Sequence, residues 1–570
     1  MLALAGATLP GCRKPDSVQG DVYAPRARGT ITFNKEIAPI VFQHCSPCHR
    51  PGESAPFALL GYDDVRKRAK QIVEVTQRRY MPPWLPDPAL VHFVGERRLT
   101  AEQLGLLQQW AAEGGVEGRA GDLPPRPQWN TRWHLGEPDL VVRPHAIFRL
   151  TADGPNVYRN LPIPIPVNAR RYVRGLEFRA NSRAVHHAFL RFDRTGEVLA
   201  LDGKDGQPGF YGLHTPKSAE SPVTFASWQP GKTPRFYPAD LAWPVEPNTV
   251  LVLQLHLQSI GKEEPIAPEV AFYFTDQPGT AIALKLPLDS YSLEIPPGVT
   301  NYAATDSFVL PVDVEIRSVL PHAHYLCRRM SGYAELPDGR RQWLMEIKDW
   351  DFNWQGDYEF AVPVRLPKGT KLSMEYTYDN STNNMRNPNH PPQLVRYGMQ
   401  TGDEMAELWL LAVMKSQEDL SALQTALHPR FINDVILTGE MMLRQNPRDA
   451  KALVDIGSAL VMAGRLPEAL ERLHLALQIN PELDEAHYFT GLALRTGKQL
   501  AEAQAEFETA LRINPRHARA CGNLALVLAE QGDLAGAARQ FQFALQLNPK
   551  DEIARNMLDQ INRAMAAPPK

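Results

Sequence analysis

The spacing of hydrophobic positions divides the chain into regions of different secondary structure. Over residues 29–116 apolar residues recur at helical intervals, as in the stripe formed by Leu104, Leu107 and Trp110. Thr100 stands where a helix cap is expected, three residues before a glutamine. This pattern predicts a small α-helical domain over 29–116.

From about residue 136 the pattern changes to short alternating runs, such as 250–256 and 371–376, separated by Pro, Gly, Asn and Asp. A Pro- and Gly-rich linker over 117–135 precedes them. Short strands without intervening helices are typical of antiparallel sandwiches. We therefore predict two antiparallel β-sandwich domains, over 136–286 and 287–415.

The last part of the chain is helical and contains an internal repeat. Asn-Pro recurs every 34 residues, at positions 446, 480, 514 and 548. Small residues and aromatic residues repeat at matching places, which is typical of the tetratricopeptide repeat. We predict a connector or half repeat over 416–449, three repeats over 450–551 and a capping helix and tail over 552–570. Such a solenoid either docks a protein partner or serves as a stabilising appendage.

Composition and charge narrow the class of protein. The chain has 570 residues and a net charge of −3, so it is a multidomain protein without a basic field for nucleic acid. It contains no apolar run of ~18 residues that would span a membrane.

Residues 1–28 resemble the end of a bacterial export signal, with an apolar run from Leu2 to Leu9 and a lipoprotein-like box ending at Cys12. We expect export to the periplasm or the cell surface. Whether a lipid anchor is attached at Cys12 is open.

Cys45-Ser46-Pro47-Cys48-His49 is the pattern of a covalently attached c-type haem. Cys45 and Cys48 lie within one turn and can each reach a vinyl edge of the porphyrin, while His49 faces the iron. The competing interpretations are a zinc knuckle and a redox dithiol. Zinc needs four ligands, and the chain has no second CxxC to supply the other two.

The region over 29–116 resembles a class I-like cytochrome c domain, in which a methionine takes the other axial position on the iron. Met81, followed by Pro82 and Pro83, is the matching candidate. His44 and His92 are rival ligands, and Met81 as a core residue is the remaining alternative.

Three histidine clusters fall within the β region: His186-His187, His256, and His322 with His324. Alternate residues of a strand share one face, so the His-x-His spacing suits one metal ion. Adjacent histidines point to opposite faces of a regular strand, so His186 and His187 need a bulge to meet one ion. Imidazole is a suitable ligand for copper, zinc, iron and nickel, so the histidines alone do not identify the metal.

The order of these motifs resembles the copper type II, ascorbate-dependent monooxygenases, the family of peptidylglycine α-hydroxylating and dopamine β-monooxygenases. The resemblance includes Thr401-Gly402-Asp403-Glu404-Met405 before an apolar strand. It implies two jelly-roll-like sandwiches with one copper ion each. His186, His187 and His256 would hold the electron-transfer copper, and His322, His324 and Met405 the oxygen-binding copper.

We therefore expect a copper-dependent monooxygenase with two copper ions and one haem c. It would hydroxylate a C–H bond of an organic substrate with dioxygen, taking electrons from ascorbate or a periplasmic redox protein through its haem. The resemblance does not supply the substrate, because no residues match the family's substrate-binding groups. The alternatives are an electron-transfer or docking protein without hydroxylase activity, and a protein of copper storage or sensing.

Overall fold

The computed structural model describes residues 23–51, 53, 55–128, 133–212, 218–220, 224–398, 400 and 402–566. The predicted anchor residue Cys12 lies outside these ranges. The chain forms two compact units. The first contains the chain up to Ala281 together with Ile347–Val362, and the second contains Ile282–Glu346 and the chain from Pro363 onward.

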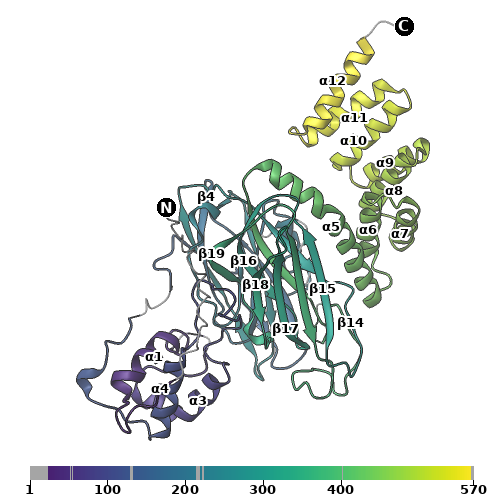
Figure 1. Cartoon of the computed structure of the whole chain (residues 1–570). Helices are drawn as coiled ribbons and strands as arrows, with labels where there is room; N and C mark the ends of the chain where they lie inside the picture. Colours follow the sequence, from purple (N-terminus) through teal and green to yellow (C-terminus); the bar gives the residue numbers. More distant parts are fainter. Residues whose placement is uncertain are drawn as a thin grey trace, which may run out of the picture. The chain divides into compact units, whose positions relative to one another are not determined.

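The N-terminal part of the first unit is a small group of helices, drawn in purple in Figure 1. These are the π-helical turn η1 (Phe33–Ile37), α1 (Ala38–His44), α2 (Tyr62–Lys67), α3 (Ala69–Gln77), α4 (Ala101–Ala112) and the 3-10 turn η2 (Ala120–Asp122). The expected cap at Thr100 is confirmed, since its side chain accepts a hydrogen bond from the Gln103 amide. Leu107 and Trp110 of α4 are almost fully buried in the core of this group.

The first β region also belongs to the first unit. Its strands are β1 (Leu140–Val142), β2 (Phe148–Leu150), β3 (Val157–Pro164), β4 (Arg171–Arg179), β5 (Val185–Asp193), β6 (Phe210–Tyr211), β7 (Ala219–Glu220), β8 (Ser227–Trp228), β9 (Trp243–Val245), β10 (Val250–Leu257), β11 (Glu264–Ile266) and β12 (Glu269–Thr275), with 3-10 turns η3 (Glu197–Leu201) and η4 (Ala239–Leu241). One sheet has the order β1-β12-β4-β9, and the other contains β6-β3-β10-β5-β7 with β8 beside β5. Side chains from both sheets share one hydrophobic core.

The second β region lies mostly in the second unit. Its strands are β13 (Ile282–Asp289), β14 (Glu294–Ile295), β15 (Tyr302–Val309), β16 (Val314–His322), β17 (Cys327–Glu335), β18 (Arg341–Ile347), β19 (Tyr358–Leu366), β20 (Lys371–Tyr378), β21 (Val395–Arg396) and β22 (Glu407–Met414). They form the sheets β13-β22-β16-β19 and β15-β20-β17-β18 and the pair β14-β21.

The predicted boundary between the two β regions, at 286/287, is five residues late. The compact units divide between Ala281 and Ile282. The reason is that β13 pairs with β22 along its whole length, including Pro287 opposite Trp409. The proline is therefore part of a strand of the second region and does not mark a joint.

The segment Ile347–Val362 is separated in sequence from the rest of the first unit but belongs to it by its contacts. We call it the bridging segment. It contains the 3-10 turn η5 (Phe352–Trp354) and the first residues of β19. Phe352, Tyr358 and Phe360 of this segment are all buried.

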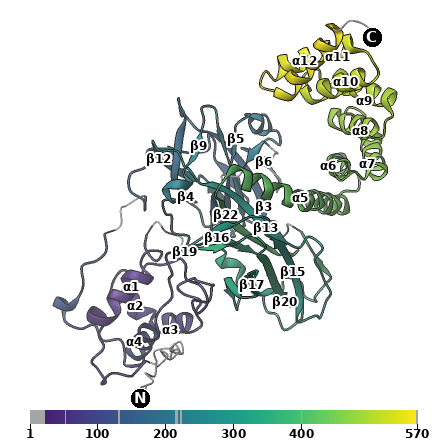
Figure 2. The ribbon, with the colours of Figure 1, turned by 45° about the horizontal axis from the view of Figure 1, so that its top comes forward.

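The C-terminal part of the second unit is a stack of helices, shown from green to yellow in Figures 1 and 2. They are α5 (Gln417–Gln445), α6 (Ala450–Met462), α7 (Leu466–Ile479), α8 (Asp484–Thr496), α9 (Leu500–Ile513), α10 (Ala518–Glu530), α11 (Leu534–Leu547) and α12 (Glu552–Ala566). The four repeated asparagines each end a helix, as the C-caps of α5, α7, α9 and α11. None of the described helices combines the length and the apolar character that crossing a membrane requires.

Candidate metal and haem sites

His186, His187 and His256 come together on neighbouring strands of the first β region. β10 pairs with β5 so that His256 lies opposite His187 and Leu257 lies opposite Val185. His186 is therefore the extra residue of a β-bulge. This is the irregularity that two adjacent histidines require if both are to face one ion.

The donor atoms of these three histidines have the spacing of a metal site. All lie within 4.8 Å of one another, and His256 Nδ1 is 3.1 Å from His187 Nε2. Two imidazole nitrogens bound at ~2.0 Å to one tetrahedral ion would lie ~3.3 Å apart, so the spacing fits a shared ion. His256 Nε2 is buried and has no hydrogen-bond partner within the described residues.

Burial keeps His256 in the form that binds metal. The side chain is almost fully buried, beneath a Tyr158 ring stacked at 4.4 Å. Burial, together with the nearby His186, lowers the pKa of His256 to about 3. The imidazole is therefore neutral near pH 7, and a neutral imidazole is the ligand form.

Two members of the second predicted ligand set, His322 and His324, lie together at the end of β16, beside β22. His322 ends β16, and His324 follows it outside the strand. The two rings still lie together, with centroids 5.4 Å apart. The pair thus meets through a turn after the strand, and not through the strand alternation that the spacing predicted. Among the described residues, no further His, Cys, Asp or Glu completes a three-donor group there.

Glu404 holds His324 and Met405 in the same place. One of its carboxylate oxygens accepts hydrogen bonds from the amides of both residues, at 2.8 Å in the case of Met405. The other oxygen accepts from the Leu326 amide at 2.8 Å. Met405 is buried and lies two residues before β22. Through Glu404 its backbone is held next to that of His324.

Sequence reasoning named Glu404 only as part of a motif and assigned it no role. It is completely buried, and this burial raises its pKa to about 8 against the opposing effect of the amide donors. Its position beside Met405 is the only sequence signal of its role. The signal is weak, because His324 and Leu326, two of the three residues whose amides donate to Glu404, lie some eighty residues earlier in the chain.

The CxxCH motif forms a compact turn directly after α1. Cys45 is the C-cap of α1, and its carbonyl accepts hydrogen bonds from the Cys48 and His49 amides at 3.2 and 2.9 Å. Ser46 is fully buried and donates to the Leu59 carbonyl at 2.6 Å. These contacts place both cysteines, which are intermediate in exposure as whole residues, within one turn. Burial raises the pKa of Cys45 to about 12.

The ring of His49 is oriented by a backbone contact. Its Nδ1 lies 3.1 Å from the Phe57 carbonyl oxygen, which is a hydrogen bond when Nδ1 carries the proton. This tautomer makes Nε2 the nitrogen for a metal, so the turn fits a haem iron. Met81 follows α3, is half-buried, and donates its amide to the Val75 carbonyl at 3.1 Å.

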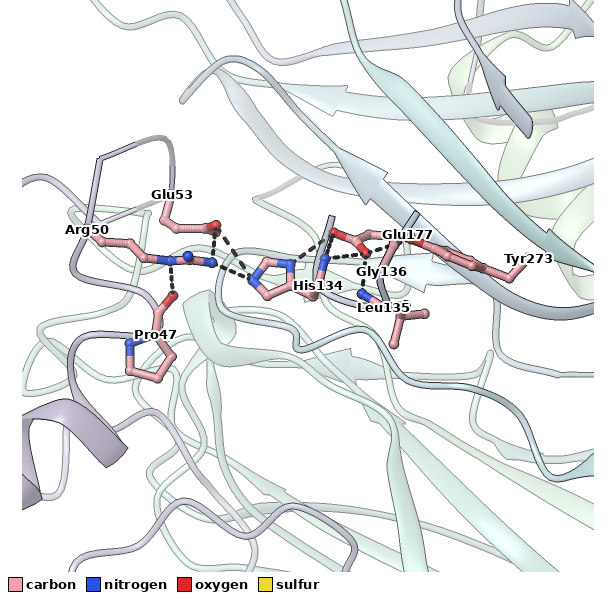
Figure 3. A network of polar contacts seen from close by, with 8 residues as sticks. All are labelled: Pro47, Arg50, Glu53, His134, Leu135, Gly136, Glu177 and Tyr273. Atoms are coloured by element: carbon pink, nitrogen blue, oxygen red, sulfur yellow. Dashed lines mark hydrogen bonds and ion pairs between the residues drawn. The ribbon is translucent and has the colours of Figure 1, made fainter. Parts of the chain in front are cut away.

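A chain of polar contacts joins the haem-motif turn to the first β region (Figure 3). Arg50 pairs with Glu53 at 2.9 Å and lies 3.0 Å from His134 Nε2. His134 Nδ1 lies 2.9 Å from the carboxylate of Glu177 on β4. Burial acts to raise the pKa of Glu177, but the contacts from His134 outweigh it and leave the pKa below its usual value.

The polar stretch between Tyr378 and His390, which could be a cleft lining or a plain turn, is a tightly bonded loop. Asn380, Asn384 and Asn387 are buried within it. The Asn380 amide donates to backbone carbonyls of two other segments, and Asn387 donates to Asn380 at 2.9 Å. The asparagines thus serve to shape the loop.

Comparison with known proteins identifies one part of the chain. The tetratricopeptide repeat family matches residues 488–552, which lie in the helices α8 to α12. The repeat predicted from the 34-residue period is therefore confirmed. No curated protein matches the chain.

Several solved structures are similar to part of the chain. The first tetratricopeptide repeat of Spaghetti (RPAP3), bound to the HSP90 peptide SRMEEVD, is 21% identical, with a TM-score of 0.20, over 21% of this chain and 94% of its own. MamA is 18% identical, with a TM-score of 0.23, over 27% of this chain and 86% of its own. The MamA RS-1 ArsTM double mutant is 23% identical, with a TM-score of 0.23, over 25% and 80%.

Proposed function

We propose that this protein is an exported copper-dependent monooxygenase that receives electrons through its own c-type haem. The observation that carries the proposal is the convergence of His186, His187 and His256 at a bulge, with donor atoms within 4.8 Å of one another. The order of motifs then extends the assignment to the second histidine pair. The helical group would be a cytochrome c domain, and the two β regions jelly-roll-like sandwiches.

Each predicted ligand has a role in this proposal. His186, His187 and His256 would hold an electron-transfer copper, and His322, His324 and Met405 an oxygen-binding copper. Copper bound by imidazole and thioether supplies one-electron redox chemistry toward dioxygen.

The chain's own residues prepare the first of these sites. Burial keeps His256 neutral, so the ligand nitrogen need not lose a proton before it binds an ion. Tyr158, stacked on that ring at 4.4 Å, fixes its plane.

At the second site the positioning residue is Glu404. Its carboxylate fixes the backbone of both His324 and Met405, so two of the three ligands are held by one side chain. Support of this kind would hold the ligands of a metal ion in place.

The repeats would dock a protein partner, which is the usual role of such solenoids. One of the similar repeat structures contains a bound peptide. An anchored or soluble periplasmic redox protein is the partner class that suits the haem. Ascorbate is the alternative reductant.

The test is oxygen uptake by the copper-loaded full-length protein with ascorbate as the reductant. Labelled dioxygen and mass spectrometry would detect hydroxylated products from a panel of peptides and aromatic amines. We expect His322→Ala to abolish coupled uptake while the haem spectrum is unchanged. His428→Ala, an exposed histidine of α5 in the same unit, is the matched control. Equal coupled turnover by His322→Ala and the wild-type protein would refute the assignment.

A second candidate is a haem and copper electron-transfer protein without hydroxylase activity. The tetratricopeptide match favours it, because docking scaffolds commonly carry such repeats. It predicts that haem and copper bind and exchange electrons, with no labelled oxygen in any product.

A further inference from the structure

The bridging segment contacts both the N-terminal part of the first unit, which carries the CxxCH motif, and the site formed by His186, His187 and His256. We propose that Tyr80, Trp354 and Phe352 form an aromatic electron path from the haem at His49 to the metal ion at His186. This inference rests on the proposed function, because it requires both cofactors. One electron leaves a ferrous haem and one reaches a cupric ion, so iron is oxidised by one unit and copper reduced by one. No atom or proton changes place.

The haem end of this path begins beside the predicted axial ligand. Tyr80 directly precedes Met81, and its ring meets that of Trp354 edge to face, with centroids 5.4 Å apart. The backbone reinforces the contact, since the Val94 amide donates to the Glu359 carbonyl at 2.8 Å and Phe93 forms a β-bridge with Phe360. The loop after Met81 is thus fixed onto the bridging segment.

The metal end of the path is a ring-on-ring contact with a predicted ligand. Phe352 stacks on His186 with centroids 5.0 Å apart and planes 21° apart. The segment is held to the first β region by charge, through the pairs of Asp357 with Lys232 and of Glu359 with Arg235, the latter at 3.0 Å. Phe352 is only 3% exposed, so the contact is shielded from water.

The middle of the path is short and covalent. Phe352 and Trp354 belong to the same 3-10 turn, η5, with one residue between them. The Asp351 side chain accepts a hydrogen bond from the Asn353 amide at 2.9 Å and so fixes this turn. Two aromatic contacts and one turn therefore connect the residue before Met81 to His186.

The polar network of Figure 3 also joins the haem motif to the first β region, but it offers a weaker route. It starts at Arg50 and ends at Glu177, which accepts hydrogen bonds from His134, Leu135 and Tyr273 and from no predicted metal ligand among the described residues. The ring between these two residues is the imidazole of His134, which meets both of them through polar contacts. We assign it the role of fixing the linker at His134.

Trp354 is the residue at which the path can be interrupted most cleanly. Its Nε1 is buried and has no hydrogen-bond partner within the described residues, so Trp354→Phe removes no hydrogen bond and keeps an aromatic ring. Trp354→Leu removes the ring. Trp84→Leu is the matched control, because Trp84 packs on Tyr358 of the same segment, at 5.3 Å, but lies off the route to His186.

The experiment is flash photoreduction of the full-length protein containing ferric haem and cupric copper, with deazaflavin as the photoreductant. Haem reoxidation is followed by its visible absorption, and loss of the cupric signal by electron paramagnetic resonance. We expect Trp354→Leu to slow haem-to-copper transfer severalfold, and Trp354→Phe and Trp84→Leu to transfer near the wild-type rate. Haem content, haem potential and copper stoichiometry are measured in every variant, and are expected to be unchanged.

The outcomes separate this inference from the proposed function. Equal transfer rates in Trp354→Leu and the wild-type protein, with both cofactors bound, overturn the path alone. Equal slowing by Trp84→Leu and Trp354→Leu also overturns it, because docking of the segment would then be its only role. Failure of the wild-type protein to bind haem or copper overturns the proposed function and the path with it.

Discussion

Replacing Glu404 with glutamine tests how the second ligand set is held. Glu404 is fully buried, and its two oxygens accept hydrogen bonds from the amides of His324, Met405 and Leu326. A carboxyl group keeps acceptor lone pairs on both oxygens even when it is protonated, whereas an amide nitrogen has none. Glu404→Gln therefore removes an acceptor from one side of the cluster in either orientation of the amide.

The expected cost follows from the number of donors left unpaired. If the amide nitrogen faces His324 and Met405, two buried N–H groups lose their acceptor. Each buried unpaired donor costs ~1–3 kcal/mol, so Glu404→Gln should destabilise this region by about 2–6 kcal/mol. If it faces Leu326 instead, the loss lies at the lower end of this range. The affinity of the second site for copper should fall about 10- to 100-fold, the usual effect of losing a supporting contact.

Hydrogen exchange with mass spectrometry is the suitable assay, because a multidomain chain does not unfold in a single transition. We expect faster exchange in peptides covering 320–330 and 402–410, and unchanged exchange in the repeats. Glu375→Gln, an exposed glutamate on β20, is the control and should change stability by less than about 0.5 kcal/mol. Wild-type protection around His324 in Glu404→Gln would refute the reasoning.

Three further predictions follow from the packing. His256→Ala should lower the copper affinity of the first site by more than about 100-fold, since losing a ligand costs more than losing a supporting contact, and a competition titration would measure it. Burial, with Asp434 and Glu407 nearby, raises the pKa of Asp289 to about 8 from 3.8. The folded state therefore binds this proton more tightly than the unfolded chain, so its stabilisation is present below pH 3.8 and is lost as the pH rises to about 8. Asp289→Asn should flatten this pH dependence in hydrogen exchange of β13, and an unchanged profile would contradict the assignment. Phe507→Ala should destabilise the repeats by about 3–5 kcal/mol in helix-unfolding measurements, because Phe507 is fully buried where a Cβ on Gly491 would meet its ring.

The repeats could be predicted from the sequence because their contacts are local. Each helix packs mainly on its neighbours, so the Asn-Pro period marks the helix ends directly, and Asn480 and Asn514 are C-caps in the structure. The cap at Thr100 was predictable for the same reason, since both of its partners lie within one turn. Where all the contacts of an element lie within a few residues of the chain, its structure can therefore be predicted from the sequence.

The candidate sites were predictable only in part, because their geometry depends on pairing between distant strands. The sequence names His186 and His187, but the bulge between them depends on the register of β5 against β10. In the same way, the spacing of His322 and His324 does not reveal that the strand ends between them. Glu404 shows the limit most clearly, since its function depends on amides contributed by a separate strand turn.

The bridging segment could not be predicted at all, because nothing in its local sequence indicates the unit to which it belongs. Its flanking residues continue into strands of the second β region, yet Phe352 stacks on His186 and Trp354 meets Tyr80. This placement indicates the order in which an electron would pass between the cofactors. Since both ends of the aromatic path lie within the first unit, the haem would be coupled first to the ion at His186. The electron-transfer role that the family resemblance gives to this site agrees with that order, and the two inferences share only His186.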